Sequence, residues 1–355
     1  MKERFLSFYS ANYKRLLVIP LVVFVVFFVL AFVFPGIPKG IDFEGGTLII
    51  IRSDKAIEAK KLEELLSKNF DFTDLSVSGI SSPTGYGVTI RFADDAAIAL
   101  AENELEQARQ LLASNTEQSI LHSKNAVQAV SKYVTGKTLS LAAKDAFDEA
   151  EKIVFQAREK STAKLQELIV SEFSLSSNVA FQKQEVSPTL GASFFATALN
   201  VSIFSIILLI IVVFIFYREL IPSLAIIASM VFDVVFALGL MALFNVPLSL
   251  SSIPALLMLA GYSIDTDILL TTRVLKRKES TPVERFFDSM MTGLTMTLTA
   301  LAALMVMLVF GFLNQIAVLY NIAAVLLFGL LGDPIATWIM NSGILLWYVE
   351  SKQKK

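Results

Sequence analysis

The residues of this sequence best suited to chemistry are ionisable side chains within long apolar stretches. Asp233 stands in the middle of one such stretch, and Asp265, Asp267 and Arg273 share a later one. A charged side chain at the centre of a membrane helix costs about 2.5–3.5 kcal/mol, so such residues face one another, a cavity or water. Carboxylates in that setting commonly carry protons or ions. We therefore take these four residues as candidates for an ion relay.

The spacing of these residues limits which of them can act together. Asp265 and Asp267 are separated by about 200° around a helix, so they cannot both point at Asp233. Arg273 follows Asp265 by about two turns and can approach the same face as a counter-charge. For each residue the alternative is a buried ion pair that only fixes helix packing. Asp333, in the last apolar stretch, is assigned to packing.

Small and hydroxylated side chains accompany these ionisable residues. Gly261 and the threonine-rich run 292–299 are suited to close packing between helices, and the threonines are alternatively suited to lining a water path.

The composition excludes most kinds of catalytic site. The 355 residues include no cysteine and a single histidine, His122, which is expected at the surface. Hydrophobic residues make up 55% and charged residues 17%, with a mean hydropathy of +0.64, compared with about 45–50% and about 25% in soluble domains. The net charge of −2 gives no reason to expect nucleic acid as a partner. We predict a membrane protein that is not an enzyme and has no cofactor and no metal site.

Six apolar segments are long enough to cross a bilayer, whose hydrocarbon core is about 30 Å thick. The first is interpreted as a retained helix rather than a cleaved signal peptide, because no small-residue cleavage site follows it. The last is too long for one straight crossing and is expected to tilt, to kink at Pro334 or to end early. The six segments are residues 16–34, 195–217, 220–244, 250–272, 289–313 and 317–349.

Basic residues predict the orientation of these segments. They precede the first segment, follow the second and fourth, and end the chain, whereas the connections 245–249 and 314–315 carry no charge. Both termini are therefore expected in the cytoplasm. The predicted layout is a cytoplasmic N-terminus (1–15), a first helix (16–34), an extracytoplasmic domain (35–194), a five-helix bundle (195–349) and a cytoplasmic C-terminus (350–355).

The extracytoplasmic block has the pattern of a small α+β domain. Its 17 basic and 22 acidic residues give a net charge of −5. The order of strands and helices predicts a ferredoxin-like split βαβ fold with a helical insertion, and its residues suggest binding or gripping rather than catalysis. The expected strands are 47–52, 75–80, 87–92 and 178–184, and the expected helices are 55–69, 94–113 and 137–173.

Four short motifs then coincide with one known family. Residues 40–47 read G-I-D-F-E-G-G-T, residues 186–191 read V-S-P-T-L-G, F-D stands at 232–233, and G-Y-S opens the segment 261–273. In this order around six helices, the four motifs resemble those of the SecF family of protein-export membrane subunits. The sequence of residues 263–267 resembles the archaeal members of that family. Besides Asp233, the motif residues are Gly40, Asp42, Phe43, Gly45, Gly46, Pro188, Gly191, Gly261 and Tyr262.

The resemblance implies a polytopic α-helical protein of the cytoplasmic membrane whose fold is like half of an RND transporter. It implies work with SecD, beside the Sec channel, on an unfolded polypeptide that crosses the membrane, with export coupled to the proton motive force or another ion gradient. Two alternatives remain open at this stage. One is half of an RND-type exporter of small molecules or lipids, and the other is an assembly factor that steadies the translocon without moving ions.

Overall fold

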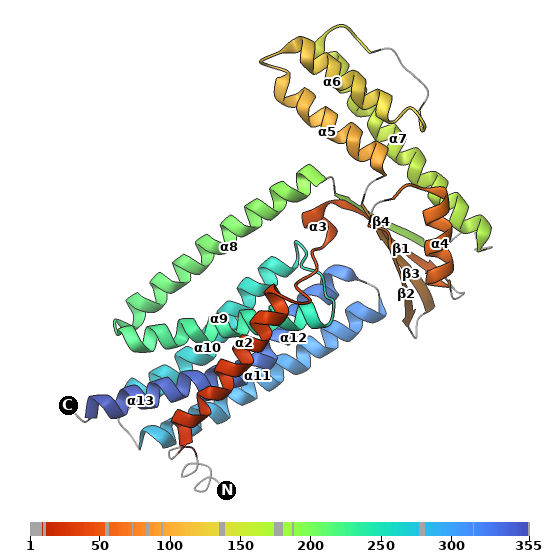
Figure 1. Cartoon of the computed structure of the whole chain (residues 1–355). Coiled ribbons are helices and arrows are strands. Elements are labelled where there is room, and N and C mark those ends of the chain that lie inside the picture. Colours follow the sequence, from red (N-terminus) through yellow and green to blue (C-terminus); the bar gives the residue numbers. More distant parts are fainter. Residues whose placement is uncertain are drawn as a thin grey trace. The chain divides into compact units, whose positions relative to one another are not determined.

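The computed structural model describes residues 9–353 except 10–11, 54–56, 73, 83–84, 94, 135–138, 174–179, 187, 277–280 and 315. Side chains are further left undescribed at 44, 80–82, 85, 180, 188–190 and 192. Several sequence predictions fall partly outside these limits: the first basic residues, the turn at 83–84, Asp94, the side chain of Pro188, the basic residues 277–278, Gln315 and the final lysines. The chain forms two compact units, Met1–Gly40 with Phe194–Lys355, and Ile41–Ser193 (Figure 1).

The first unit is built from long apolar helices. Six helices in the described part of the chain are long and apolar enough to cross a membrane, which confirms the predicted number. The apolar residues of the first two spans lie all around their helices, as expected for helices in contact with lipid. Five of the spans contain α2 (Val18–Phe32), α8 (Pro188–Tyr217), α9 (Leu220–Leu243), α10 (Ser252–Lys276) and α11 (Pro282–Leu313). The sixth span, Ala317–Lys352, contains both α12 (Ala317–Ile335) and α13 (Ser342–Gln353).

Local sequence signals explain how the helices of this unit begin and end. At the start of α11 the Thr281 hydroxyl accepts from the Glu284 N–H at 3.4 Å, and the Glu284 carboxylate accepts from the Thr281 N–H at 2.9 Å, which is a capping box. Arg218, the first residue after α8, and Asn245, the second residue after α9, adopt left-handed φ values of 55° and 54°. Each of these helices therefore stops and the chain reverses.

The last span is interrupted where the sequence predicts a kink. Pro334 lies inside α12 and has no N–H to donate to the preceding turn. A π-helical turn, η1 (Ala336–Asn341), follows and leads into α13. Such turns are frequent at functional sites because they rotate the side chains that come after them.

The second unit contains a four-stranded antiparallel sheet in the order β2-β3-β1-β4. This order, with α4 (Ala59–Asn69) between the first two strands and α7 (Ala143–Glu172) before the last, confirms the ferredoxin-like prediction. Ile49, Ile51 and Ile90 from the sheet pack against Leu62 of α4 and Leu165 of α7. The strands are β1 (Gly46–Ser53), β2 (Ser76–Ser82), β3 (Gly85–Phe92) and β4 (Ala180–Val186), and a single turn, α3 (Ile41–Glu44), precedes them.

The helices of this unit begin later than the sequence pattern indicates. α4 spans Ala59–Asn69 and α7 spans Ala143–Glu172. α5 spans Ala96–Leu111, because the Asp95 carboxylate accepts the Ala97 N–H at 3.0 Å and caps the helix there.

The helical insertion contains one helix that the sequence pattern did not reveal. This helix, α6 (Thr116–Ala129), buries Ser119, Ser123 and Ala126 against its neighbours. The Ser119 hydroxyl donates to the Ala108 carbonyl of α5 at 2.8 Å. A buried face made of small and hydroxylated residues has no apolar stripe, so periodicity could not find it.

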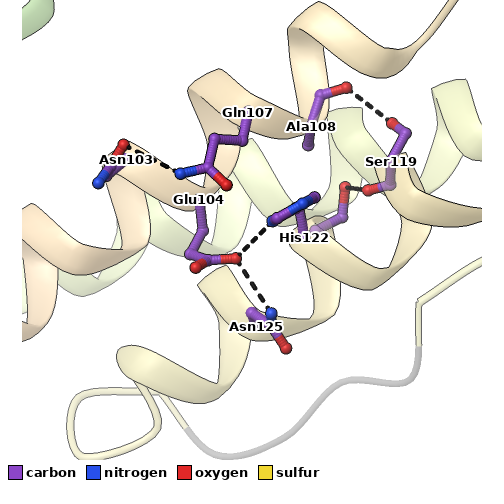
Figure 2. Close-up of polar contacts among 8 residues, drawn as sticks. Asn103, Glu104, Gln107, Ala108, Ser119, His122 and Asn125 are labelled. Atoms are coloured by element: carbon purple, nitrogen blue, oxygen red, sulfur yellow. Dashed lines mark hydrogen bonds and ion pairs between the residues drawn. The ribbon is translucent and has the colours of Figure 1, made fainter. Parts of the chain in front are cut away.

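The single histidine joins α5 to α6 (Figure 2). His122 Nδ1 lies 2.8 Å from a carboxylate oxygen of Glu104, and Asn125 donates to the same oxygen at 3.1 Å. The hydrogen bond with His122 is the main reason that the pKa of Glu104 lies below its ordinary value of 4.5. His122 is therefore a structural link between two helices of the insertion.

The contact between Glu104 and His122 predicts that the packing of α5 against α6 loses stability in acid. Because folding lowers the pKa of Glu104, its ionised form adds stability above pH 4.5, and this stability is lost as the pH falls through the lowered value. We expect Glu104→Gln to speed hydrogen exchange across α6 at pH 6–7, with a loss of about 1 kcal/mol in opening free energy. The difference from wild type should vanish near pH 3. Equal exchange at pH 7 in the two proteins would contradict the prediction, and Glu106→Gln is the control on the same helix.

Candidate functional site

Three aspartates meet in the interior of the helical bundle. Asp233 of α9, Asp267 of α10 and Asp333 of α12 are fully buried. Asp267 and Asp333 both lie within electrostatic range of Asp233, and Asp333 also acts on Asp267. The structure thus places Asp267, one of the two α10 aspartates that the sequence allows beside Asp233, in the cluster, and it adds Asp333.

Of the three aspartates, Asp333 accepts the most hydrogen bonds. One carboxylate oxygen accepts hydrogen bonds from the hydroxyls of Thr266 at 2.9 Å and Thr337 at 3.0 Å, and the other accepts from Thr297 at 3.1 Å. These threonines come from α10, η1 and α11. Asp333 therefore ties three helical segments to α12, which agrees with the packing role that the sequence analysis assigns to it.

Asp267 is held on one side only. Its Oδ1 accepts a hydrogen bond from Asn341 Nδ2 at 2.7 Å, whereas its Oδ2 has no hydrogen-bond partner in the described part of the chain. Asn341 is the last residue of η1. The π-helical turn after Pro334 is therefore what presents this amide to α10.

Asp233 has no hydrogen bond at either carboxylate oxygen among the described side chains. Ser263 comes near enough to influence it but stays outside hydrogen-bond geometry, and the buried hydroxyls of Ser229 and Ser263 are likewise without partners. A buried carboxylate normally has donors or a cation beside it. Asp233 is thus the one carboxyl group of the cluster that the rest of the bundle leaves uncompensated.

Two of the predicted relay residues lie away from this cluster. Asp265 is exposed, whereas Asp267 is buried, as their separation around the helix requires. Arg273 does not approach the carboxylates: it donates to the Asp288 carbonyl and to the Thr292 hydroxyl, both at 3.1 Å. The expectation that Arg273 shares their face is corrected, since its side chain turns toward α11.

The sequence analysis did not place Asp333, Thr266, Thr297 or Asn341 in the site. In the sequence, Thr297 is one member of the threonine-rich run 292–299, which is suited either to packing or to lining a water path. The available signal was an aspartate and an asparagine eight residues apart in one apolar span. That signal shows that polar groups are buried, but it does not show which helix receives them.

Small residues decide how closely the helices approach around the cluster. A Cβ on Gly332, beside Asp333, would lie 2.8 Å from the ring of Phe236, so α9 and α12 contact each other here only because that residue is a glycine. Gly261 differs, because nothing lies within 4 Å of the position its Cβ would occupy. The close packing expected at Gly261 is not made within this chain.

The glycine motif before β1 serves the second unit. Gly46 has φ +116°, and a Cβ there would lie 2.6 Å from the Phe92 carbonyl oxygen, so no other residue fits without a shift. The backbone of Phe43 and Gly45 packs against Gly191, whose Cβ would lie 3.0 Å from the Gly45 nitrogen. The two motifs at the ends of the domain sequence thus meet in space.

The other motif residues have simpler surroundings. Asp42 accepts from the Gln184 amide at 2.9 Å, and Tyr262 is 38% exposed on α10. The Gly40 N–H donates to the Leu248 carbonyl at 2.7 Å, which ties the segment after α2 to the α9–α10 connection. Together with the buried aspartates, these motifs serve two separate tasks: closing the α+β domain and joining the helices.

Asp333 accepts three hydrogen bonds and Asp233 accepts none from the described side chains, so their removal is predicted to change stability by different amounts. Asp333→Ala leaves three buried hydroxyls without their acceptor and should lower the free energy of unfolding by about 2–3 kcal/mol. Asp233→Ala removes no hydrogen bond and should change it by less than about 1 kcal/mol. Thermal unfolding of the detergent-purified full chain measures both. A loss at Asp233 as large as that at Asp333 would show that Asp233 has an unseen partner.

Comparisons with known proteins agree with this architecture. The family described as "Protein export membrane protein SecD/SecF, C-terminal" matches residues 168–351, and "SecD/SecF GG Motif" matches residues 30–57, which contain the first glycine motif. The protein-export membrane protein SecF of Methanothermobacter thermautotrophicus is 33% identical over 342 residues, covering 96% of this chain and 93% of that protein. SecF of Methanocaldococcus jannaschii is 41% identical over 177 residues, which are 49% of this chain and 63% of that protein.

A solved structure shares the fold. The crystal structure of SecDF, a translocon-associated membrane protein from Thermus thermophilus, superposes with a TM-score of 0.61 at 17% identity. The match covers 96% of this chain and 38% of the SecDF chain. Since a family description matches more than half of the sequence, and a relative is aligned over nearly its full length, the chain belongs to the SecF family of protein-export membrane proteins.

Proposed function

We propose that this chain is an auxiliary subunit of Sec protein export, working with a SecD-type subunit and coupling ion movement through its helical bundle to the transport of polypeptide. Membership of the SecF family supports the export role. The observation that carries the coupling is Asp233, a buried carboxyl group without a hydrogen-bond partner among the described side chains.

The three aspartates differ in a way that suits a relay. Asp333 is fixed by three hydroxyls, Asp267 by one amide, and Asp233 by none. A proton or cation arriving at Asp233 would relieve an uncompensated buried charge, and its departure would restore that charge. Because Asp267 lies within electrostatic range, its free oxygen is the next acceptor.

The energy available to such a relay is modest but sufficient for a two-state change. One elementary charge that falls through 100 mV supplies about 2.3 kcal/mol. This free energy shifts an equilibrium about 50-fold, which is enough to favour one arrangement of the helices over another. Several ions are needed to shift the equilibrium almost completely from one arrangement to the other.

The orientation proposed from the basic residues fits the order of elements in the structure. Arg218 lies between α8 and α9, and Arg273 and Lys276 lie at the end of α10. The α9–α10 connection, by contrast, carries no charge. The positive-inside rule then places both termini in the cytoplasm and the α+β domain outside it.

A partner in the membrane is supported by two exposed surfaces. The membrane-spanning part of α8 is only 6% buried, against 67% for α9. On α10, Met258 and Tyr262 are exposed beside Asp265 and the open space at Gly261. A carboxylate in contact with lipid is costly, so we assign this face of α10 to the SecD-type subunit rather than to lipid.

The relay predicts that Asp233→Asn and Asp267→Asn slow export without loss of protein. Removing the coupled charge should slow maturation of a secreted reporter by up to about 50-fold, the factor that corresponds to about 2.3 kcal/mol. The measurement is pulse-chase export in cells whose only copy carries the variant, with its membrane level determined. Asp288→Asn is the control, since it makes the same chemical change at an exposed position.

Normal export and normal ion flux in the Asp233→Asn, Asp267→Asn double variant would reduce the aspartates to packing residues. The chain would then act as an assembly factor of the translocon that moves no ions. A drug or lipid phenotype in the absence of precursor accumulation would instead favour the exporter alternative.

The α10 surface predicts a separate outcome. Gly261→Leu combined with Asp265→Leu fills the open space and removes the carboxylate, and it should lower co-purification with the SecD-type subunit about tenfold, as expected when a tight helix contact is overpacked. Thr299→Leu on the exposed face of α11 is the control. Equal recovery of the partner with both variants would place its contact elsewhere.

A further inference from the structure

The domain Ile41–Ser193 contains a cavity that the proposed relay does not use. Its volume is about 600 Å³, within the range of about 300–1,000 Å³ typical of ligand pockets. It lies between the end of α4, the residues after α6 and the middle of α7. Four lysines line it: Lys68, Lys132, Lys160 and Lys164.

The position of the cavity follows from the two cores of the domain. α7 contributes Val154 and Ala157 to the core of the helical insertion, and Leu165 and Ile169 to the core beneath the sheet. Between these two sets, α7 passes from one core to the other (Figure 1). Lys160 and Lys164, from this part of α7, line the cavity. The cavity is therefore a consequence of inserting a second helical core into the α+β fold.

The floor of the cavity is a fixed polar network. Asp95 is 1% exposed, accepts hydrogen bonds from Lys132 at 2.9 Å and Tyr133 at 2.8 Å, and caps α5. The charge of Lys132 is thus balanced by Asp95. Burial is the first cause of the raised pKa of Tyr133, so Tyr133 keeps its hydroxyl proton and presents a neutral aromatic wall.

The remaining lysines carry positive charge that the described part of the chain does not balance with an ion pair. Lys160 and Lys68 make no salt bridge with described residues, and Lys164 lies 5.9 Å from the centre of the Phe70 ring. The lining contains two acidic residues, Asp95, which pairs with Lys132, and Asp71. A basic cavity thus occurs in a domain whose 16 basic and 22 acidic residues give a net charge of −6, where chance placement would favour acidic linings.

The spacing of the lysines suits an extended chain. Lys160 and Lys164 are one helical turn apart, with Cβ atoms separated by about 5–6 Å. In an extended peptide, side chains at alternate positions lie on one side and are about 6.5 Å apart. Acidic residues at every second position can therefore meet both lysines, while the side chains between them face the opposite side.

We propose that this cavity binds an acidic segment of an extended polypeptide, with carboxylates on Lys160 and Lys164 and apolar groups against Phe70 and Tyr133. This inference rests on the proposed export function, because the polypeptide in question is the one being exported. It adds to that function a chemical preference and a location on the second unit.

The test is fluorescence anisotropy with the detergent-purified full chain and a labelled decapeptide that carries aspartate at every second position. We expect binding that is about tenfold weaker in Lys160→Gln, Lys164→Gln, since two charge contacts are lost. Lys144→Gln, Lys152→Gln makes the same charge change on exposed turns of α7 and should bind as wild type does. Asp71→Asn should bind about twofold more tightly because a like charge is removed, and this gain keeps the test informative if the lysine variant folds poorly.

Further peptides and one small anion separate the outcomes. A decapeptide with lysine in place of aspartate should not bind, and one with its aspartates grouped together should bind several-fold more weakly. Equal binding by the two lysine double variants, or displacement of the peptide by an equimolar concentration of inorganic phosphate, would overturn the proposal. Failure here would leave the export role standing, because the reporter assay with Asp233→Asn tests that role independently of this cavity.

Discussion

The dominant constraint on the helical bundle is the burial of three carboxyl groups where water and lipid head groups cannot reach them. Each needs compensation within the bundle, and the structure supplies it unequally. Asp333 receives three hydroxyl hydrogen bonds, Asp267 receives one from Asn341, and Asp233 receives none from the described side chains. The arrangement of α9 to α12, including the π-helical turn, brings these groups and their donors to one place.

The unequal hydrogen bonding supports different roles for the aspartates, a structural one for Asp333 and the proposed relay role for Asp233. Asp333 accepts hydrogen bonds from α10, α11 and η1, and these hydrogen bonds stabilise the packing of the three segments against α12. Asp233 contributes no such bond, and a group that is costly to bury and holds nothing together is the one expected to act in function. Asp265 differs from the three buried aspartates because it is exposed on the surface of α10.

In the second unit, one helix takes part in two hydrophobic cores. Its ferredoxin-like part would need only α4 and α7 to cover one face of the sheet, yet α7 extends beyond the sheet to build a second core with α5 and α6. Two cores on one helix leave a gap between them, and charged residues of α7 line it. The helical insertion thus creates the one basic cavity that we find in the described part of this acidic domain.

The sequence by itself determined the features that rest on local physics. Long uncharged segments specify the number of membrane helices, alternation and β-branched residues specify the strands, and Pro334 marks the interruption of the last span. The angle between Asp265 and Asp267 already requires that only one of them can join Asp233. Tertiary structure decided the rest: which aspartate faces inward, that Thr297 and Asn341 reach carboxylates on other helices, that Arg273 turns to α11, and that α6 exists at all. These outcomes depend on contacts between residues 11 to 74 positions apart, and no pattern within a single helix records the direction of its neighbour.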